Sequence, residues 1–412
     1  MKPRDTLGSL VAFFAFDQRS RWGQSFCWCR CAPLLEAVRT ARKHSAGLTV
    51  DLSDGDSPRP TLSSRRSFTM PGDAASRKHL PVAGPGVLAP GRGDDSLSIS
   101  IIIPSYRRAD ALTACLSALS RQTRQPAEVI VVARYGDSDT LAICAGATRI
   151  TSLRTVLVRR PGMIAALNAG VDAAGGDVIA ITDDDCCPEE DWLERIGAEF
   201  SAERSVGAVG GPDLIEGARE TPARAGQVGR ISWYGRISGN HHAGARREDV
   251  NFLKGANMAF RSDALAGFDE RLRGSGAQIG NDMQASLSVW RRGYRVIYNP
   301  AVRVRHYPAK RSDGDPRLNR SLELLREQHH NEMYVIASTL PPWRAIVVGV
   351  YTLLVGYRSA PGLAHLALRL FTGPRRLRGL AEFASVTLGR AEGLRTWTVT
   401  TQAKFHARAT GA

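Results

Sequence analysis

The chain has 412 residues, of which 43% are hydrophobic and 23% are charged, a balance typical of a globular protein with a substantial core and two or three domains. The formal net charge of +15 favours an anionic partner, such as a phosphate-bearing substrate or anionic lipid. Nucleic acid is set aside as a partner, because the arginines are dispersed and the sequence contains no recognition module.

Residues 1–96 contain "DLSDGDSPRPTLSSRR" and "LPVAGPGVLAPGRGDD", which are rich in proline, glycine, serine and charge. Such a segment buries too little apolar surface to offset its chain entropy, so we expect a disordered basic extension. "LVAFFAF" resembles a signal peptide only faintly, because a small-residue cleavage site is not evident. The seven cysteines form neither a disulfide framework nor a zinc site, which indicates a reducing compartment.

From Leu97 the sequence alternates between apolar runs and helical patterns. "ISIIIP" predicts a buried parallel strand, and the apolar residues after it recur at helical spacing. Further strands are expected at 128–132, 155–158 and 177–182, and a helix at 163–174 that ends at Gly175-Gly176. Short alternating strands and helices predict an α/β domain with a mostly parallel sheet.

Three consecutive acids, Asp183, Asp184 and Asp185, follow the strand at 177–182. Ligands of open α/β sheets bind beyond the carboxyl ends of the strands, which is where these acids are expected. In an extended segment the carboxylates of Asp183 and Asp185 could point the same way and offer hard oxygen ligands to Mg²⁺ or Mn²⁺. A solvated acidic turn is the alternative. The neighbouring Cys186 and Cys187 are soft ligands and are expected to pack in the core.

Four motifs in order carry a resemblance to a known family: "SIIIPSYRRADALTACLSALSRQT", "PGMIAALNAG", "GDVIAITDDD", and "NFLKGANMAFRSDALAGFDERL" with "NDMQASLSVWRRGYRVIYNP". Over residues 97–310 the chain resembles the family 2 glycosyltransferases, which have the Rossmann-like GT-A fold. The resemblance implies a nucleotide-sugar donor, a divalent cation and transfer with inversion at the anomeric carbon.

The resemblance also implies roles for individual residues. Asp183 and Asp185 match the acids that bridge through metal to the donor diphosphate, and Asp184 is expected to face away or to touch the ribose. Asp282 matches the catalytic base, although Asn281 stands where relatives carry glutamate. Other matched positions are expected to contact the donor or to line the sugar side: Pro104, Ser105, Tyr106, Gly162, Asn168, Gly255 and Asn257.

Two features leave the donor's nucleobase open. Relatives carry an acidic pair after the second strand, and this chain has Ala133-Arg134 there. Asp137 or Asp139 could replace the base-reading acid, and Arg134 could instead face a phosphate. In "VRVRHYPAKR", His306 could be a third metal ligand, while Lys310 and Arg311 could hold the diphosphate. An ordinary hydrogen-bonded histidine is the alternative.

The tail, residues 311–412, is expected to be helical. Its apolar stretch, Ala345 to Tyr357, makes about 20 Å of helix, short of the ~30 Å hydrocarbon core of a membrane. We expect a peripheral anchor, because Arg344 and Arg358 flank the stretch and a basic cluster follows it. That cluster comprises Arg369, Arg375, Arg376 and Arg378. A helical pair packed on the 97–310 domain and a tilted span are the alternatives.

Together these features predict an inverting glycosyltransferase that acts on a lipid-linked or polysaccharide acceptor in bacterial envelope or exopolysaccharide assembly. We expect it in the cytoplasm or at the cytoplasmic face of the membrane. One alternative is a sugar-nucleotidyltransferase, although "PSYRR" after the first strand is not the glycine-rich phosphate loop such an enzyme needs. A non-catalytic nucleotide-sugar-binding protein is the other.

Overall fold

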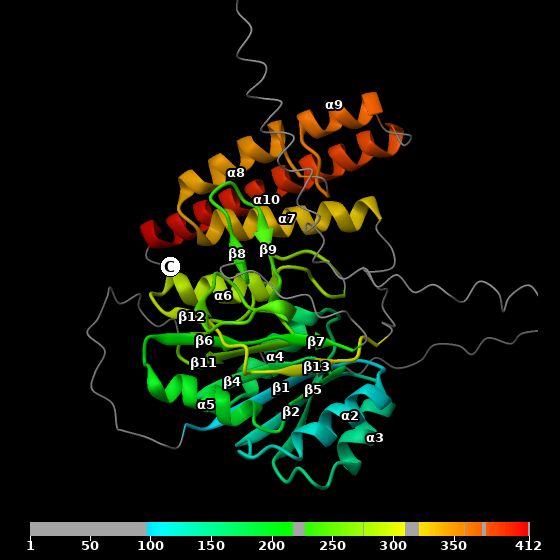
Figure 1. Ribbon diagram of the computed structural model, residues 1–412, viewed down its shortest axis with the longest axis vertical. Helices are drawn as coiled ribbons and strands as arrows, with labels where there is room; N and C mark the ends of the chain where they lie inside the picture. The colour runs from blue at the N-terminus through cyan, green and yellow to red at the C-terminus, as the bar shows by residue number, and fades with distance from the viewer. Residues whose placement is uncertain are drawn as a thin grey trace, which may run out of the picture. The chain divides into compact units, whose positions relative to one another are not determined.

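The fold was taken from a computed structural model, which describes residues 97–216, 227–274, 276–309, 321–357, 359–372 and 376–410 (Figure 1). The expectations for residues 1–96, Lys310, Arg311, Arg358 and Arg375, and for the side chain of Arg376, lie outside the described part of the chain. The described residues belong to one compact unit.

An eight-stranded sheet has the strand order β10-β12-β6-β11-β4-β1-β2-β3. Its strands are β1 (Ile99–Ser105), β2 (Glu128–Arg134), β3 (Leu153–Val158), β4 (Val178–Thr182), β6 (Val206–Gly210), β10 (Glu248–Asp249), β11 (Asn257–Arg261) and β12 (Arg295–Tyr298). Strands β4, β1, β2 and β3 pair in parallel, as do β6 and β12, whereas β11 runs antiparallel between β4 and β6. The four strands predicted from the sequence are confirmed, and so is the mostly parallel sheet.

Helices cover both faces of this sheet because β1 is apolar on both sides. Ile102 contributes to the core cluster shared with α4 (Met163–Ala173) and α6 (Asn281–Arg291). Ile101 and Ile103 contribute to the opposite cluster, shared with α2 (Ala109–Leu119) and α5 (Trp192–Ala202). Full burial of each isoleucine side chain contributes about 1.5–3 kcal/mol. A further helix, α3 (Ser138–Gly146), follows β2.

A small second sheet has the order β5-β13-β7 and places two distant segments beside the acidic triplet. Its strands are β5 (Cys186–Pro188), β13 (Val304–His306) and β7 (Asp213–Ile215). His306 pairs with Cys186 on one side and with Ile215 on the other. This pairing brings the histidine side chain next to Asp185.

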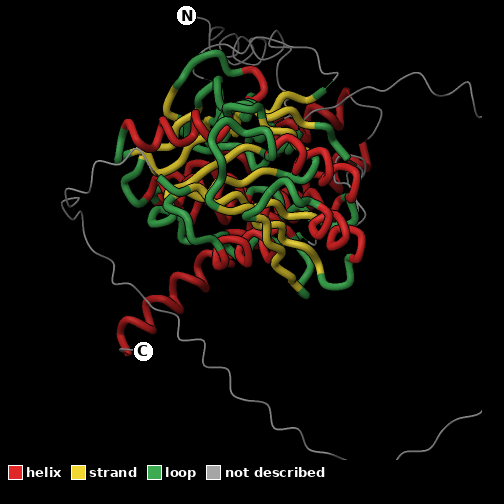
Figure 2. Tube along the Cα trace, turned by 90° about the horizontal axis from the view of Figure 1, so that it is seen from below, coloured by secondary structure: helices red, strands yellow, loops and turns green. Residues whose placement is uncertain are grey.

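The chain then forms a hairpin of β8 (Arg230–Ile231) and β9 (Ile237–Ser238), a short 3₁₀ helix η1 (His241–Ala243), and four C-terminal helices. These helices are α7 (Leu322–Thr339), α8 (Pro342–Leu354), α9 (Leu363–Thr372) and α10 (Arg376–Thr410). The expected helical tail is confirmed. Its α7 packs on α6, and Met333 and Tyr334 of α7 belong to the same core cluster as Ile102. Helix α10 lies along α7, and its C-terminal end projects beyond the other helices (Figure 2).

Among the described residues, no helix combines the length and the apolar composition that crossing a membrane would require.

Candidate active site

The three acids fill the connection between β4 and β5, at the carboxyl end of β4. Asp184 points inward: its Oδ2 accepts a hydrogen bond from the Ser105 hydroxyl at 2.9 Å, and its Oδ1 accepts one from the Arg108 guanidinium at 2.6 Å. The carboxylate is buried, and burial raises its pKa to about 6. Asp184 therefore ties the acidic loop to the end of β1, a role that its sequence position does not reveal.

Asp185 and His306 lie together, as the sequence predicts. Asp185 Oδ1 is 3.3 Å from His306 Nε2, and Asp185 Oδ2 accepts a hydrogen bond from the Ala309 N–H at 3.0 Å. Burial opposes ionisation of both groups, but their mutual contact outweighs it. The pKa of Asp185 falls to about 2, and the pKa of His306, which also contacts Asp213, rises to about 9.

Asp213 on β7 was not expected from the sequence. Its Oδ2 is 3.5 Å from His306 Nδ1 and 3.4 Å from the Lys254 ammonium. Neither carboxylate oxygen accepts a hydrogen bond from the described residues, although the side chain is almost fully buried. The signal in the sequence was weak, because a single acid 28 positions after Asp185 belongs to no motif that brings the two together.

These side chains fit a divalent cation. Asp185, Cys186 and His306 offer ligand atoms that lie within 4.8 Å of one another. Burial raises the pKa of the Cys186 thiol well above its usual range, so the carboxylate and imidazole are the better ligands for Mg²⁺ or Mn²⁺. In metal sites the second ring nitrogen of a ligating histidine commonly contacts a carboxylate. Asp213 occupies this position beside His306. The Asp183 side chain lines the adjoining pocket and is not part of this cluster.

That pocket opens at the carboxyl ends of β1, β2 and β4. Several of the expected donor residues line it: Pro104, Ser105, Tyr106, Arg134, Gly162 and Asp184. The Arg134 guanidinium lies over the Tyr106 ring at 4.3 Å, and Arg108 and Arg160 also face the pocket. An aromatic ring together with three guanidinium groups suits a ligand that combines a flat ring with phosphate charge.

Three other residues expected at the donor are occupied by protein contacts. Asp137 is buried as the N-cap of α3, where it accepts hydrogen bonds from the Thr140 N–H and hydroxyl and from the Arg107 N–H. The Asn168 amide pairs with both backbone groups of Phe268. The fully buried Asn257 accepts from Trp192 Nε1 and donates to the carbonyls of Pro212 and Val302. None of the three lines the pocket described above.

Asp282 is the second residue of α6, after Gly280 in the left-handed region at the N-cap. Its Oδ2 accepts a hydrogen bond from the Gly255 N–H at 3.2 Å, and its Oδ1 accepts one from the Met283 N–H at 2.8 Å. Burial raises the pKa of this carboxyl above its ordinary value, while Lys254 and the two N–H groups act against that rise. This hydrogen bond joins the loop at Gly255, before β11, to the start of α6.

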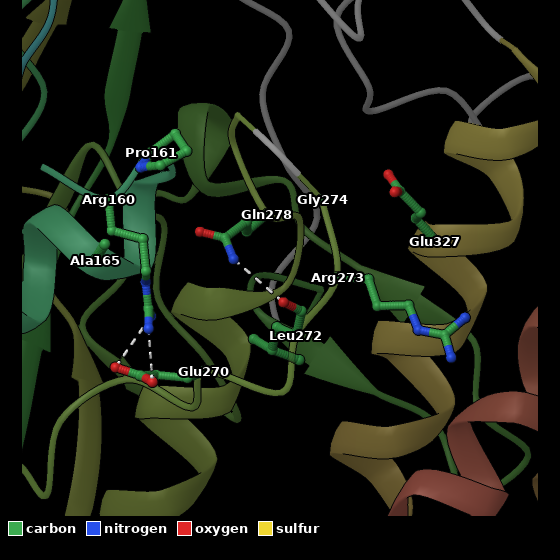
Figure 3. A pocket seen from close by; sticks show the side chains of 9 residues that line it. All are labelled: Arg160, Pro161, Ala165, Glu270, Leu272, Arg273, Gly274, Gln278 and Glu327. Carbon is green, nitrogen blue, oxygen red and sulfur yellow. Dashed lines mark hydrogen bonds and ion pairs between the residues drawn. The ribbon is translucent and has the colours of Figure 1, made fainter. Parts of the chain in front are cut away.

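A second, larger pocket of about 490 Å³ adjoins the first and shares Arg160 with it (Figure 3). Arg160 pairs with Glu270 at 3.1 Å on one side of this pocket, and Arg273 and Glu327 lie on the other. Gln278 lines this pocket, and its side chain accepts a hydrogen bond from the Ile164 N–H and donates one to the Leu272 carbonyl. The mixture of charges suits a polar, uncharged ligand better than a strongly charged one.

Comparison with known proteins gives a family match. Residues 100–268 match the family described as Glycosyl transferase family 2. The glycosyltransferase AglE of Haloferax volcanii is 32% identical over 117 residues, which are 27% of this chain and 38% of that protein. The glucosyl-dolichyl phosphate glucuronosyltransferase of the same organism is 23% identical over 235 residues, 51% of this chain and 69% of that protein.

Among solved structures, a mannosyltransferase from Pyrobaculum calidifontis, PcManGT, in complex with GDP-Man and Mn²⁺, aligns with 77% of this chain and 87% of its own. The sequence identity is 22% and the TM-score is 0.45.

Proposed function

We propose that the chain, whose residues 100–268 match the family described as Glycosyl transferase family 2, transfers a sugar from a nucleotide-sugar donor to an acceptor hydroxyl, with inversion. One observation supports the proposal most directly. The acids after β4, His306 and Asp282 converge on one edge of the sheet, where a pocket with an aromatic ring and three guanidinium groups opens. The charge of Lys254 acts on Asp183, Asp213 and Asp282 together.

In this reaction the acceptor oxygen attacks the anomeric carbon as the bond from that carbon to the diphosphate oxygen breaks. Asp185 and His306 would hold a divalent cation, which when bound supplies Lewis-acid stabilisation of the charge on the diphosphate. Arg108, Arg134 and Arg160 add fixed positive charge at the same pocket. Asp282 accepts the proton of the acceptor hydroxyl, a step that usually accelerates turnover by about 10²–10⁴-fold.

We assign the donor nucleoside to the pocket at Tyr106 and Arg134, and Asp183 to the donor side of the cation. The walls of this pocket are supported by residues that do not line it. Hydrogen bonds of Asp137 position the loop at Arg107, those of Asn168 position the segment at Phe268, and those of Asn257 position β11. Their contribution to donor binding is therefore indirect. The acceptor sugar is assigned to the 490 Å³ pocket beside Arg160 and Gln278.

A lipid-linked acceptor is supported by the likeness to the glucosyl-dolichyl phosphate glucuronosyltransferase. The surface of the C-terminal helices supports the same proposal. On α8, Trp343, Ile346 and Val350 are 56%, 67% and 53% exposed at helical spacing. Trp233, on the turn of the β8–β9 hairpin, is 64% exposed. Exposed apolar patches of this kind are typical of protein or membrane contacts.

The hairpin and α8 form one continuous surface. The Arg344 guanidinium donates to the carbonyls of Ile231 and Ser232, and the rings of Tyr234 and Tyr351 are 4.8 Å apart. We propose that this apolar surface rests on the cytoplasmic face of a membrane, where the protein serves envelope or exopolysaccharide assembly.

A donor screen tests the proposed function. UDP-, GDP- and dTDP-sugars are each added with and without Mn²⁺ while the melting temperature is recorded, and transfer to lipid-linked acceptors is then assayed for the donor that binds. We expect one nucleotide class to raise the melting temperature by several degrees in the presence of Mn²⁺. If every donor leaves the melting temperature unchanged, the proposal is wrong.

A further inference from the structure

The buried carboxylate of Asp213 has two cationic neighbours, the imidazole of His306 and the ammonium of Lys254. Removing an ion from water is costly unless an opposite charge compensates, so Asp213 holds the Lys254 side chain in place. Asp213 in turn raises the pKa of Lys254 above its ordinary value, with a smaller contribution from Asp282, and the lysine stays charged.

The backbone places Lys254 next to Asp282. Lys254 immediately precedes Gly255, whose N–H donates to Asp282 Oδ2. The Lys254 side chain is 45% exposed, while its ammonium lies 3.4 Å from the buried Asp213 carboxylate. The charged groups that act on Lys254 are Asp213, Asp282 and Asp183, and Lys254 is the charged group that acts most strongly on Asp282.

A catalytic carboxylate on this helix meets conflicting requirements. It must be shielded from water so that it contacts the acceptor hydroxyl, yet burial favours the protonated form, which cannot accept a proton. The Gly255 and Met283 N–H groups aim the carboxylate and offset part of the burial. A fixed positive charge nearby offsets more of it, because an opposite charge favours the ionised form of a carboxyl group.

We propose that Lys254 is a positioning residue for the transfer reaction: anchored by Asp213, its ammonium keeps the Asp282 carboxylate ionised and ready to accept a proton. The inference rests on the proposed function in one respect, the assignment of Asp282 as the base. Lys254 itself touches no reacting atom in this scheme. A lysine that served only to neutralise Asp213 would leave the ionisation of Asp282 unchanged when it was replaced.

The test measures the ionisation of Asp282 directly. The full-length protein is labelled at the aspartate carboxyl carbons, and the Asp282 resonance is identified by its absence in Asp282→Asn and followed from pH 3 to 9. Lys254→Gln removes the charge at similar length, and Lys254→Arg retains it. Arg246→Gln is the matched control, because Arg246 is exposed and its loss changes the net charge by the same amount.

We expect the pKa of Asp282 to rise by about one unit in Lys254→Gln and to stay within about 0.3 units in Lys254→Arg and Arg246→Gln. Once a donor is identified, the acidic limb of the pH profile of kcat/KM should shift to higher pH by the same amount in Lys254→Gln. At pH values below this limb kcat/KM should be roughly tenfold lower than in wild type, and the difference should disappear at higher pH. Should Lys254→Gln fail to fold, Lys254→Met provides the neutral variant.

An unchanged pKa of Asp282 in the folded neutral variant overturns the inference, as does a rate loss that is equal at every pH. Failure of this inference and failure of the proposed function give different results. If the pKa moves but the wild-type protein transfers no sugar, the proposed function fails and the link between Lys254 and Asp282 stands. If the wild type transfers sugar and the pKa does not move, only this inference fails.

Discussion

Asp184 is a buried acid whose side chain joins two loops at the edge of the sheet. Its contacts with Ser105 and Arg108 join the loop after β4 to the loop after β1, and the Arg108 side chain is only 12% exposed. Removing the partner of a buried charge costs about 3–5 kcal/mol in typical cases. Because Arg108 keeps a longer contact with Asp185 at 3.3 Å, the lower part of that range applies here.

We therefore expect Asp184→Ala to lower the free energy of unfolding by about 3 kcal/mol, and Asp183→Ala, whose side chain faces the pocket, to lower it by less than about 1 kcal/mol. Urea denaturation monitored by circular dichroism measures both. Equal values for the two variants would show that Asp184 has no special structural role.

The contact between Asp185 and His306 leads to a second expectation. Asp185→Ala and His306→Ala should each abolish the Mn²⁺-dependent part of the donor-induced rise in melting temperature, because each removes one of the ligands of the cation. The control is His242→Ala, an exposed histidine on η1 that should behave as wild type. A full Mn²⁺ response in Asp185→Ala would place the cation elsewhere.

For the base, Asp282→Asn retains the shape of the side chain and an oxygen that accepts from Gly255, but it cannot take up a proton. We expect donor binding by calorimetry to remain within about threefold of wild type and turnover to fall by about 10²-fold or more. Turnover close to that of wild type would reassign Asp282 to a purely structural role at the start of α6.

At the level of elements, α10 lies against α7 at a distance that only glycine permits. A Cβ at Gly389 would stand 2.3 Å from the Arg326 carbonyl oxygen, and a Cβ at Gly393 would stand 2.4 Å from the His330 carbonyl oxygen. The two glycines are four residues apart and therefore share one face of α10. Polar contacts flank this seam, including the pair of Arg273 with Glu392 at 2.5 Å.

We expect Gly393→Ala to destabilise the protein by about 1–3 kcal/mol, because the added methyl group meets backbone that cannot move independently. Gly379→Ala is the matched control on the same helix. Its Cβ would lie 3.8 Å from the nearest atom, so the higher helix propensity of alanine should stabilise it by up to about 1 kcal/mol. Thermal melts of both variants measure the difference, and a shift in the same direction would contradict close packing at the seam.

At the level of the whole molecule, the C-terminal helices join the core on one side and expose apolar residues on another. The arginines expected to contact anionic lipid are partly occupied: Arg369 and Arg378 both bind Glu382, at 2.8 and 3.1 Å. Arg344 likewise turns toward the β8–β9 hairpin. A membrane contact would therefore depend mainly on the apolar residues of α8 and on Trp233.

Vesicle flotation tests this contact. The wild-type protein should float with anionic vesicles and retain much of its binding in high salt, whereas a variant with Ile346→Asp and Val350→Asp should remain in the soluble fraction, since apolar burial supplies most of the affinity. Arg378→Gln is the control and should bind nearly as wild type. Loss of binding in Arg378→Gln with retention in the double variant would indicate an electrostatic anchor instead.

The sequence alone determined those features that depend on local pattern. β-Branched runs predicted β1, β2, β3 and β4, because such runs are apolar on both faces. The three acids followed a strand whose end the sequence marked, and His306 was a candidate for the same cation. Motif order predicted the resemblance to family 2 glycosyltransferases, whose family model matches residues 100–268, and the apolar stretch Ala345 to Tyr357 predicted a helical tail.

Only the tertiary structure decided which side chains meet. Asp213 and Lys254 joined the site because β7, β13 and the loop before β11 converge there, and such long-range pairing leaves no local pattern in the sequence. The same holds for Asp137, Asn168 and Asn257, whose polar groups could face a ligand or the backbone until the neighbouring elements were in place. A residue type defines what chemistry is available, but burial and partners, which come from distant segments, define which chemistry is used.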